Sequence, residues 1–329
     1  MLWPGARCRT SPVRALCFDG VLGLRERPIP EPANGQARVR VRLAGICGTD
    51  LQIVRGYAGH RGVLGHELVG DVEQHGDPSW IGRRVVAEIN VGCGGCEACA
   101  RGLRAHCATR RVIGIREHDG AFAPFVLVPH ENLHVVPDRV DDHAAVFVEP
   151  LAAAFEILEQ VALVGGSQVA VIGDGRLGLL VAMVLVDRGC DVTVVGRHPR
   201  KLAIAAGLGA HTKLGDDVRP RSHDCVVEAT GAGDGFALAQ RMIRPRGTIV
   251  VKSTTHGTTA VALAPIVVDE ITVIGSRCGP FAPAIAALDR LDPRVLVDDV
   301  FALADGVRAF ARAAEPGVLK VLLDMTGER

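Results

Sequence analysis

The chain has 329 residues, of which 48% are apolar, and its 37 basic and 37 acidic residues give a formal net charge of zero. The apolar content excludes a disordered chain, and the length suits two domains better than three. Because the net charge is zero and the pI is near 7.2, the composition does not indicate a nucleic acid or an anionic membrane as a partner.

The beginning of the chain lacks a regular pattern. Residues 1–12 are rich in Pro, Arg and Gly and contain no apolar stretch of the kind that a secretory signal has. We expect either a disordered extension or translation that begins at Val13, where a first strand starts. The longest apolar run, Leu177 to Val186, has only about ten residues, so no membrane span is expected.

The first half of the chain reads as a β domain. From residue 13 to about residue 144, short apolar runs are separated by Gly and Pro. Residues 37–43 alternate apolar and charged side chains, which is the period-two pattern of a half-exposed strand. This half therefore predicts a compact, largely antiparallel β domain.

Within this half, the types of residue indicate a first candidate metal site. Cys47 opens a Cys-Gly-Thr-Asp run, and His66 lies in a Gly-His-Glu run that includes Glu67. Glu149, much later in the chain, is a second candidate carboxylate, and the sequence does not rank it against Glu67. A zinc ion with three such ligands keeps a fourth position for water or substrate oxygen, where it acts as a Lewis acid.

Four thiols form a second candidate metal site. They lie at spacings of two, two and seven intervening residues, as Cys93, Cys96, Cys99 and Cys107. Short Cys-x-x-Cys turns let sulfurs converge on one tetrahedral ion, and neighbouring glycines permit the tight loop. Four protein ligands leave no open position, so this zinc should be structural. Since zinc thiolates persist best in a reducing compartment, we expect a cytoplasmic protein.

After Glu149 the pattern changes to alternating helices and strands. The expected elements are a helix at 151–161, strands at 168–173, 191–195, 225–228, 248–251 and 271–275, and helices at 176–188 and 199–208. This alternation predicts a parallel, doubly wound sheet. Lys252, Ser253, Thr254 and His256 follow the strand at 248–251, and either one of them contacts a ligand or the segment is a plain polar loop.

A glycine-rich loop joins the first of these strands to its helix, with the sequence Gly173-Asp-Gly175-Arg176-Leu177-Gly178. The strand before it and the helix after it are the context that makes the motif specific. Its glycines permit a tight turn and close approach of the backbone to a dinucleotide pyrophosphate at the helix N-terminus. We expect this loop to bind a nicotinamide coenzyme.

The end of the second strand indicates which coenzyme is bound. An NAD site carries an acid about twenty residues after the loop, to bind the ribose hydroxyls of the adenosine. Here the chain has Gly196, Arg197, His198, Arg200 and Lys201 instead. A small residue followed by cations makes room for a 2′-phosphate and neutralises it, so NADP is favoured over NAD. The alternative is a solvated helix start, with NAD bound through backbone contacts.

Taken together, these motifs resemble the zinc-dependent medium-chain alcohol dehydrogenase superfamily, over essentially the whole chain from Val13. The runs around Cys47 and Glu149-Pro-Leu are most similar to its sorbitol, threonine and glucose dehydrogenase branch. The resemblance implies an α/β two-domain fold: a chaperonin-10-like β domain with one catalytic and one structural zinc, and a Rossmann domain for the coenzyme. We expect the first at residues 13–150, completed by 276–329, and the second at 151–275.

The resemblance also implies a reaction. Hydride passes between a secondary alcohol or polyol-like substrate and NADP, with NAD possible, and the alcohol proton leaves through Thr49. Family members often carry a His three residues later, where this chain has Gln52. The alternatives are an NADPH-dependent aldehyde or ketone reductase of a biosynthetic pathway and a non-catalytic NADPH-binding protein. The family forms homodimers and homotetramers, and the sequence fixes neither the oligomer nor the substrate.

Overall fold

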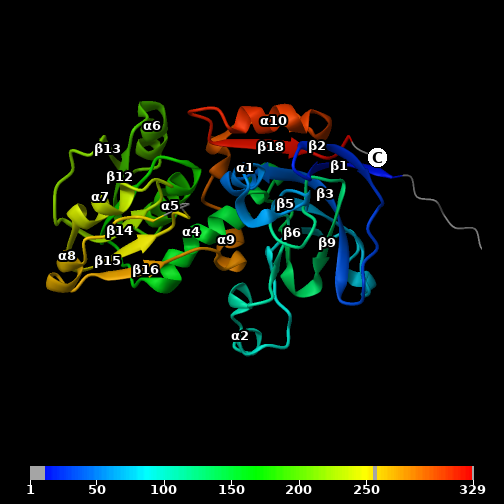
Figure 1. The fold of residues 1–329 in the computed structure, drawn as a ribbon, viewed down its shortest axis with the longest axis horizontal. Helices are drawn as coiled ribbons and strands as arrows, with labels where there is room; N and C mark the ends of the chain where they lie inside the picture. Colours follow the sequence, from blue (N-terminus) through cyan, green and yellow to red (C-terminus); the bar gives the residue numbers. More distant parts are fainter. Residues whose placement is uncertain (1–11, 255–257, 328–329) are drawn as a thin grey trace, which may run out of the picture. The chain divides into compact units, whose positions relative to one another are not determined.

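A computed structural model describes residues 12–254 and 258–327 of the chain (Figure 1). The chain divides into two compact units, one formed by residues up to Val146 together with Asp298–Arg329, and the other by Phe147–Val297. The extension expected before Val13 lies outside the described residues, apart from Pro12. Among the described helices, none combines the length and the apolar character that a membrane span requires.

Antiparallel pairing dominates the first unit. β1 (Val13–Phe18) pairs with β2 (Leu22–Arg27) and with β4 (Gly62–Val63). A seven-stranded sheet has the order β10-β6-β5-β3-β18-β17, with β9 also pairing with β3. Its strands are β3 (Gln36–Ile46), β5 (Glu67–Gln74), β6 (Arg84–Ala87), β9 (Phe125–Pro129), β10 (Leu133–Val135), β17 (Val297–Ala302) and β18 (Lys320–Asp324).

The alternating pattern of residues 37–43 becomes the buried and outward faces of β3. Val39 and Val41 are buried, whereas Arg40 between them is exposed. At the far end of the same strand, Val321 of β18 lies opposite Ile46. The last strand of the chain therefore completes the sheet of the first unit.

Short elements fill the rest of the first unit. They are α1 (Gly48–Val54), α2 (Glu97–Ala100), α3 (Asp142–Ala145), α10 (Gly306–Ala313), the pair β7 (Asn90–Val91) and β8 (Arg111–Val112), and the 3-10 turns η1 (Tyr57–Gly59), η2 (Pro78–Trp80), η3 (Arg104–His106), η4 (His130–Asn132) and η6 (Leu303–Asp305). The candidate metal ligands of this unit lie in or beside these short segments, where a strand ends and a turn begins.

The second unit is built on a six-stranded sheet in which every pairing is parallel, with the order β13-β12-β11-β14-β15-β16. Its strands are β11 (Gln168–Ile172), β12 (Asp191–Gly196), β13 (His211–Leu214), β14 (His223–Glu228), β15 (Ile243–Val251) and β16 (Thr272–Gly275). The strand order reverses between β11 and β14, and the crevice beyond the carboxyl ends of the strands at that point is where such sheets bind ligands. The predicted fold class is confirmed.

Helices connect these strands and cover the sheet. They are α4 (Val148–Gln160), α5 (Arg176–Asp187), α6 (Pro199–Gly207), α7 (Gly235–Met242), α8 (Leu263–Val268) and α9 (Phe281–Ala287), with the 3-10 turn η5 (Pro293–Leu296). The apolar run from Leu177 lies in α5, which packs against β11, β12 and α4. Contact on several sides explains why nearly the whole helix is apolar.

The boundaries between the units differ from the expected ones. The second unit begins at Phe147 and continues to Val297, rather than ending near Gly275. The reason is packing, because α9 lies against α4. At Gly279 the two segments approach so closely that a Cβ atom would overlap the carbonyl oxygen of Ala152. The segment after β16 is thereby part of the second unit.

Candidate functional site

The four predicted thiols come together in the first unit. The sulfur atoms of Cys93, Cys96, Cys99 and Cys107 all lie within 4.8 Å of one another. The Sγ atoms of Cys96 and Cys107 are 3.7 Å apart, close to the ~3.8 Å that separates sulfurs on a tetrahedral zinc with bonds of about 2.3 Å. The residues present therefore fit a structural zinc ion.

The local chain explains the geometry of this thiol cluster. It lies between β7 and β8, where a Cβ atom on Gly92 would be 2.9 Å from the Cys99 sulfur, so a glycine makes room for that ligand. The backbone N–H of Cys93 donates to the Cys107 sulfur over 3.4 Å. This bond, together with the Thr109 hydroxyl, lowers the pKa of Cys107 to about 6. These hydrogen bonds favour the thiolate of Cys107, the form that binds metal.

A second cluster forms where β3 and β5 lie side by side. One ligand atom each from Cys47, His66 and Glu67 lies within 4.8 Å of the other two. Cys47 is the N-cap residue of α1, directly after β3, and His66 directly precedes β5. Because Gly45 of β3 pairs with Glu67 of β5, the antiparallel register brings these strand ends together. Thr49 follows in α1, with its hydroxyl oxygen 3.8 Å from the Cys47 sulfur.

Asp50 organises this cluster, and its part was not foreseen from the sequence. The side chain is fully buried, accepts the N–H groups of Cys47 at 2.8 Å and of Gly65 at 3.3 Å, and lies 3.3 Å from His66 Nδ1. A carboxylate behind one ring nitrogen leaves the other for a metal. Burial lowers the pKa of His66, but Asp50 and Cys47 outweigh burial and hold that pKa well above its usual value. The ring is therefore suited to a cation, whether a proton or a metal.

The two oxygens of the Glu67 carboxylate differ in their hydrogen bonding. Its Oε2 accepts a hydrogen bond from Lys320 of β18, and both side chains are 1% exposed. Its Oε1 is buried and is one of five such side-chain atoms in the described part of the chain that have no hydrogen-bond partner. A buried, unpaired carboxylate oxygen is costly, and a metal ion would satisfy it. Glu149, the other candidate, lies in the first turn of α4, in the second unit.

In the second unit, the glycine-rich loop has the form that a dinucleotide needs. Gly173 has φ +119, and a Cβ atom there would lie 2.6 Å from the carbonyl oxygen of Ala229, while one on Gly178 would overlap the carbonyl oxygen of Gly173. The space beside Gly175 is open, and α5 begins directly after it. Since N–H groups in a first helical turn lack partners within the helix, they are available to a phosphate.

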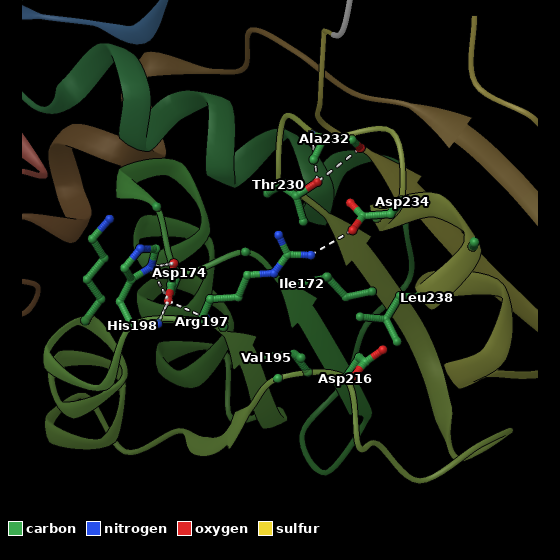
Figure 2. A pocket seen from close by; sticks show the side chains of 18 of the residues that line it. Ile172, Asp174, Val195, Arg197, His198, Asp216, Thr230, Ala232, Asp234 and Leu238 are labelled. Atoms are coloured by element: carbon green, nitrogen blue, oxygen red, sulfur yellow. Dashed lines mark hydrogen bonds and ion pairs between the residues drawn. The ribbon is translucent and has the colours of Figure 1, made fainter. Parts of the chain in front are cut away.

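The loop borders a cavity of about 640 Å³ beyond the carboxyl ends of β11, β12 and β14 (Figure 2). Of the predicted coenzyme residues, five line it, namely Gly173, Gly175, Gly196, Arg197 and His198. Four others, Arg176, Leu177, Gly178 and Arg200, are not among its lining residues. Lys201, the last cation of the run that follows β12, also lines the cavity.

Comparison with known proteins identifies the family. The family models for the alcohol dehydrogenase GroES-like domain and for the zinc-binding dehydrogenase match residues 33–138 and 177–292. A D-altritol 5-dehydrogenase of Agrobacterium fabrum is 30% identical over 91% of this chain and 95% of its own. The chain belongs to the zinc-dependent medium-chain alcohol dehydrogenase superfamily. It is an enzyme, a zinc-containing NAD(P)-dependent alcohol dehydrogenase, as the sequence predicted.

Two solved structures extend the likeness of this dehydrogenase to bound coenzymes. A zinc-binding dehydrogenase of Sinorhizobium meliloti 1021, bound to NADP, matches with a TM-score of 0.90 at 27% identity, over 96% of this chain and 100% of its own. A short chain alcohol dehydrogenase of Escherichia coli CFT073, complexed with NADH, matches with a TM-score of 0.89 at 27% identity and the same coverage. Relatives of this dehydrogenase thus hold either nicotinamide coenzyme.

The part of the cavity that follows β12 in this dehydrogenase has charges of both signs. Arg197 extends across the cavity and pairs with Asp234 at 2.7 Å, and both side chains are largely exposed (Figure 2). On the other side, the ring of His198 bonds to Asp174, which comes from the glycine-rich loop itself. Asp174 and Asp234 were not predicted to line the site, because the dinucleotide-binding pattern places its acid at the end of the second strand.

Lys252 of the dehydrogenase is buried and has a structural role. Its side chain is 8% exposed, and its ammonium donates to the carbonyl oxygen of Ala153 at 2.6 Å, to the hydroxyl of Ser276 at 3.1 Å and to the carbonyl oxygen of Arg277 at 3.1 Å. These bonds tie α4 to the segment after β16. Burial lowers the pKa of Lys252 to about 8. His256, predicted in the same segment, lies outside the described residues.

Proposed function

We propose that this dehydrogenase transfers hydride reversibly between a secondary alcohol or polyol-like substrate and NADP, with NAD as a second coenzyme. The observation that carries the proposal is the cluster of Cys47, His66 and Glu67, in which one buried carboxylate oxygen has no hydrogen-bond partner among the residues that the structure describes. The polyol class is supported by the relative named for D-altritol. Zinc at this cluster supplies a Lewis acid that lowers the pKa of the alcohol.

The residues around the cluster would bind the metal, transfer the alcohol proton and orient the imidazole ring. Cys47 and His66 would hold the metal, with Glu149 or Glu67 as the third ligand. Thr49 is close enough to the Cys47 sulfur for its hydroxyl to accept the alcohol proton. Since Gln52 cannot take up a proton as histidine does, the proton continues through water, the coenzyme ribose or Glu149. Asp50 keeps the imidazole of His66 oriented throughout.

The third ligand can be assigned by zinc content. Glu67→Ala and Glu149→Ala each remove one candidate carboxylate, and only loss of the ligand should lower zinc from two ions per chain towards one. The unpaired oxygen of Glu67 favours that residue, whereas its bond to Lys320 holds the other oxygen away from a metal. Full zinc in both single variants would exclude an essential role for either one in binding the metal.

The four-thiol cluster supports a separate structural zinc. Its sulfur spacing fits a closed tetrahedral site, and such a site stabilises the loop that contains it without contacting substrate. The proposed count is therefore two zinc ions per chain, one at each cluster. Elemental analysis of the purified protein against its molar concentration tests this count directly.

The cavity beside the glycine-rich loop supports the coenzyme preference. Arg197, His198 and Lys201 bring nitrogen donors to the cavity wall just after the end of β12, and two of the three are cations. Such groups suit a 2′-phosphate, so we propose NADP as the preferred coenzyme. Measuring kcat/KM with NADP and NAD in parallel tests the preference, and a higher value with NAD would contradict it.

The second unit also supports a homo-oligomer, either a dimer or a tetramer. β16 is the edge strand of the parallel sheet, and the adjoining α8 exposes Val267 by 74% and Val268 by 78%. An unpaired edge beside exposed apolar side chains is a typical surface for association. Light scattering should give a dimer or larger, and Val268→Asp should lower the mass. Val21→Asp, at a residue 68% exposed in the first unit, is the control.

The substrate is best found by a screen of alcohols, polyols and amino alcohols on zinc-replete protein, with absorbance of the reduced nicotinamide as the signal. Turnover with polyols would support the proposal, whereas activity confined to carbonyl reduction with NADPH would favour the biosynthetic reductase instead. The thiolate ligand sets function best under reducing conditions, so we propose the cytoplasm as the compartment. Fractionation of the cells that produce the protein tests the location.

A further inference from the structure

Asp174 fills the place that an acid at the end of β12 would occupy. It is the second residue of the glycine-rich loop, yet its side chain turns towards the neighbouring strand (Figure 2). A Cβ atom built on Gly196 would lie 2.5 Å from Asp174 Oδ2 and 2.6 Å from Asp174 Cβ. Position 196 must therefore be glycine, and the carboxylate found at this point comes from the loop.

The bonds of Asp174 are divided unequally between its two oxygens. Oδ2 accepts the backbone N–H groups of Arg197 at 2.8 Å and of His198 at 2.7 Å. The ring nitrogen Nδ1 of His198 lies 3.0 Å from each oxygen, and it is the only partner that the described residues give to Oδ1. A carboxylate oxygen can accept two hydrogen bonds, so Oδ1 retains capacity for another.

Asp174 is also available to a ligand, and it is charged. Its side chain is 9% exposed, and the residue lines the coenzyme cavity. Burial raises the pKa of Asp174, but the hydrogen bonds from His198 and Arg197 outweigh burial and lower that pKa below its usual value. The carboxylate is thus ionised at neutral pH. Its negative charge lies within hydrogen-bonding distance of the backbone that follows β12, the point at which dinucleotide folds read the ribose of the adenosine.

We propose that Asp174 is a specificity-determining residue that reads this ribose. Oδ1 accepts a hydrogen bond from the 2′-hydroxyl of NAD, whereas the same charge opposes the 2′-phosphate of NADP. The proposal rests on the coenzyme site of the proposed function and deepens it. Asp174 favours NAD and Arg197 favours NADP, so the preference reflects the balance of the two, and the enzyme retains affinity for both coenzymes.

The surrounding charges are consistent with this balance. Arg197 is held at 2.7 Å by Asp234, but the two side chains are 74% and 64% exposed, and exposed pairs contribute little. Arg197 is therefore free to turn towards a phosphate. His198, bonded to Asp174 through Nδ1, takes up part of the hydrogen-bonding capacity of the carboxylate. A 2′-phosphate can therefore bind beside Asp174, although the carboxylate repels it.

The test is Asp174→Asn, with dissociation constants for NADH and NADPH measured by nicotinamide fluorescence on the purified protein. The amide keeps one oxygen for the N–H groups of Arg197 and His198, so the turn is retained while the charge is lost. We expect affinity for NADH to fall by about tenfold, the contribution of one hydrogen bond to a charged group. Affinity for NADPH should rise several-fold, because repulsion is removed.

The decisive result is that Asp174→Asn weakens the binding of NADH and strengthens the binding of NADPH. A purely structural role for Asp174 would instead weaken the binding of both coenzymes. Asp216→Asn is the matched control, since Asp216 lines the same cavity but its side chain is 83% exposed. Equal weakening of both coenzymes by Asp174→Asn, or an effect no larger than that of the control, would overturn the proposal. If the Asn variant does not fold, Asp174→Ser removes the same charge. The same opposite changes in affinity for NADH and NADPH are then expected.

A separate variant distinguishes this inference from the proposed NADP preference. If the unmodified enzyme binds NADPH no more tightly than NADH, and Arg197→Ala changes neither affinity, the proposed preference is wrong. The opposite shifts of Asp174→Asn would still establish that this residue reads the ribose. If NADPH is preferred and depends on Arg197, but Asp174→Asn shifts both affinities alike, only the inference on Asp174 fails.

Discussion

The buried pair of Lys320 and Glu67 gives the sharpest test of the first unit. Both side chains are 1% exposed, and Lys320 donates to one carboxylate oxygen only. Lys320→Met removes the cation and leaves a buried carboxylate to which the described residues give no partner on either oxygen. Removing one member of a buried pair costs about 3–5 kcal/mol, because the remaining charge is uncompensated. We expect a loss of this size in zinc-free protein.

Two comparisons separate charge from packing. In Lys320→Met/Glu67→Gln no uncompensated charge remains, so most of the lost stability should return. Lys213→Met, at an exposed residue of β13, should change stability by less than about 0.5 kcal/mol. Zinc provides the third comparison, because the carboxylate freed in Lys320→Met has a metal as an alternative partner. The loss should therefore be smaller in zinc-loaded than in zinc-free protein.

Urea unfolding followed by tryptophan fluorescence is the assay, since Trp80 lies in the first unit. Two units need not unfold together, so the fluorescence transition should be compared with calorimetry. A cost for Lys320→Met no greater than that for Lys213→Met would refute the argument that the pair is buried and charged. An equal cost with and without zinc would instead show that Glu67 does not contact the metal.

Three further predictions concern the metal sites and the second unit. Cys47→Ala should abolish turnover with little change in Tm, whereas Cys99→Ala should lower Tm by several degrees; each should lose one zinc by elemental analysis. Asp50→Asn should weaken zinc binding about 10–100-fold in chelator competition, since it supports a ligand from behind. Burial lowers the pKa of Lys252 from 10.5 to about 8. The unfolded chain therefore binds more protons between those values, and stability relative to Lys252→Met should rise by about 3 kcal/mol over that pH range. The prediction is wrong if the difference in the free energy of unfolding between the unmodified protein and Lys252→Met, measured with urea, does not change over that pH range.

The sequence predicted the elements that depend on local pattern. The alternation in residues 37–43 gave β3, and the regular succession of strands and helices after Glu149 gave the parallel sheet. The thiols of Cys93 to Cys107 are neighbours in sequence, so their convergence needed no knowledge of the rest of the fold. The Gly173 loop could be recognised for the same reason, because its strand, turn and helix are contiguous.

The residues that sequence reasoning missed act through space. Lys320 reaches Glu67 only because β18 returns to the sheet of the first unit beside β3. Asp50 belongs to the Cys-Gly-Thr-Asp run that the sequence analysis identified, but its contact with His66 depends on the pairing of β3 with β5. The compact second unit continues past Gly275, where Gly279 packs against α4, and this packing leaves no pattern in the sequence.

The same reasoning makes Gly196 and Asp174 a single feature of the coenzyme site. In the sequence, Gly196 marks the absence of an acid and favours NADP over NAD. In the folded unit, that glycine is the space into which the Asp174 carboxylate fits. Introducing an acid by Gly196→Asp would therefore force two carboxylates together rather than create an NAD site. A change of coenzyme preference at this position requires that both residues be exchanged, because the loop and the strand end share one volume.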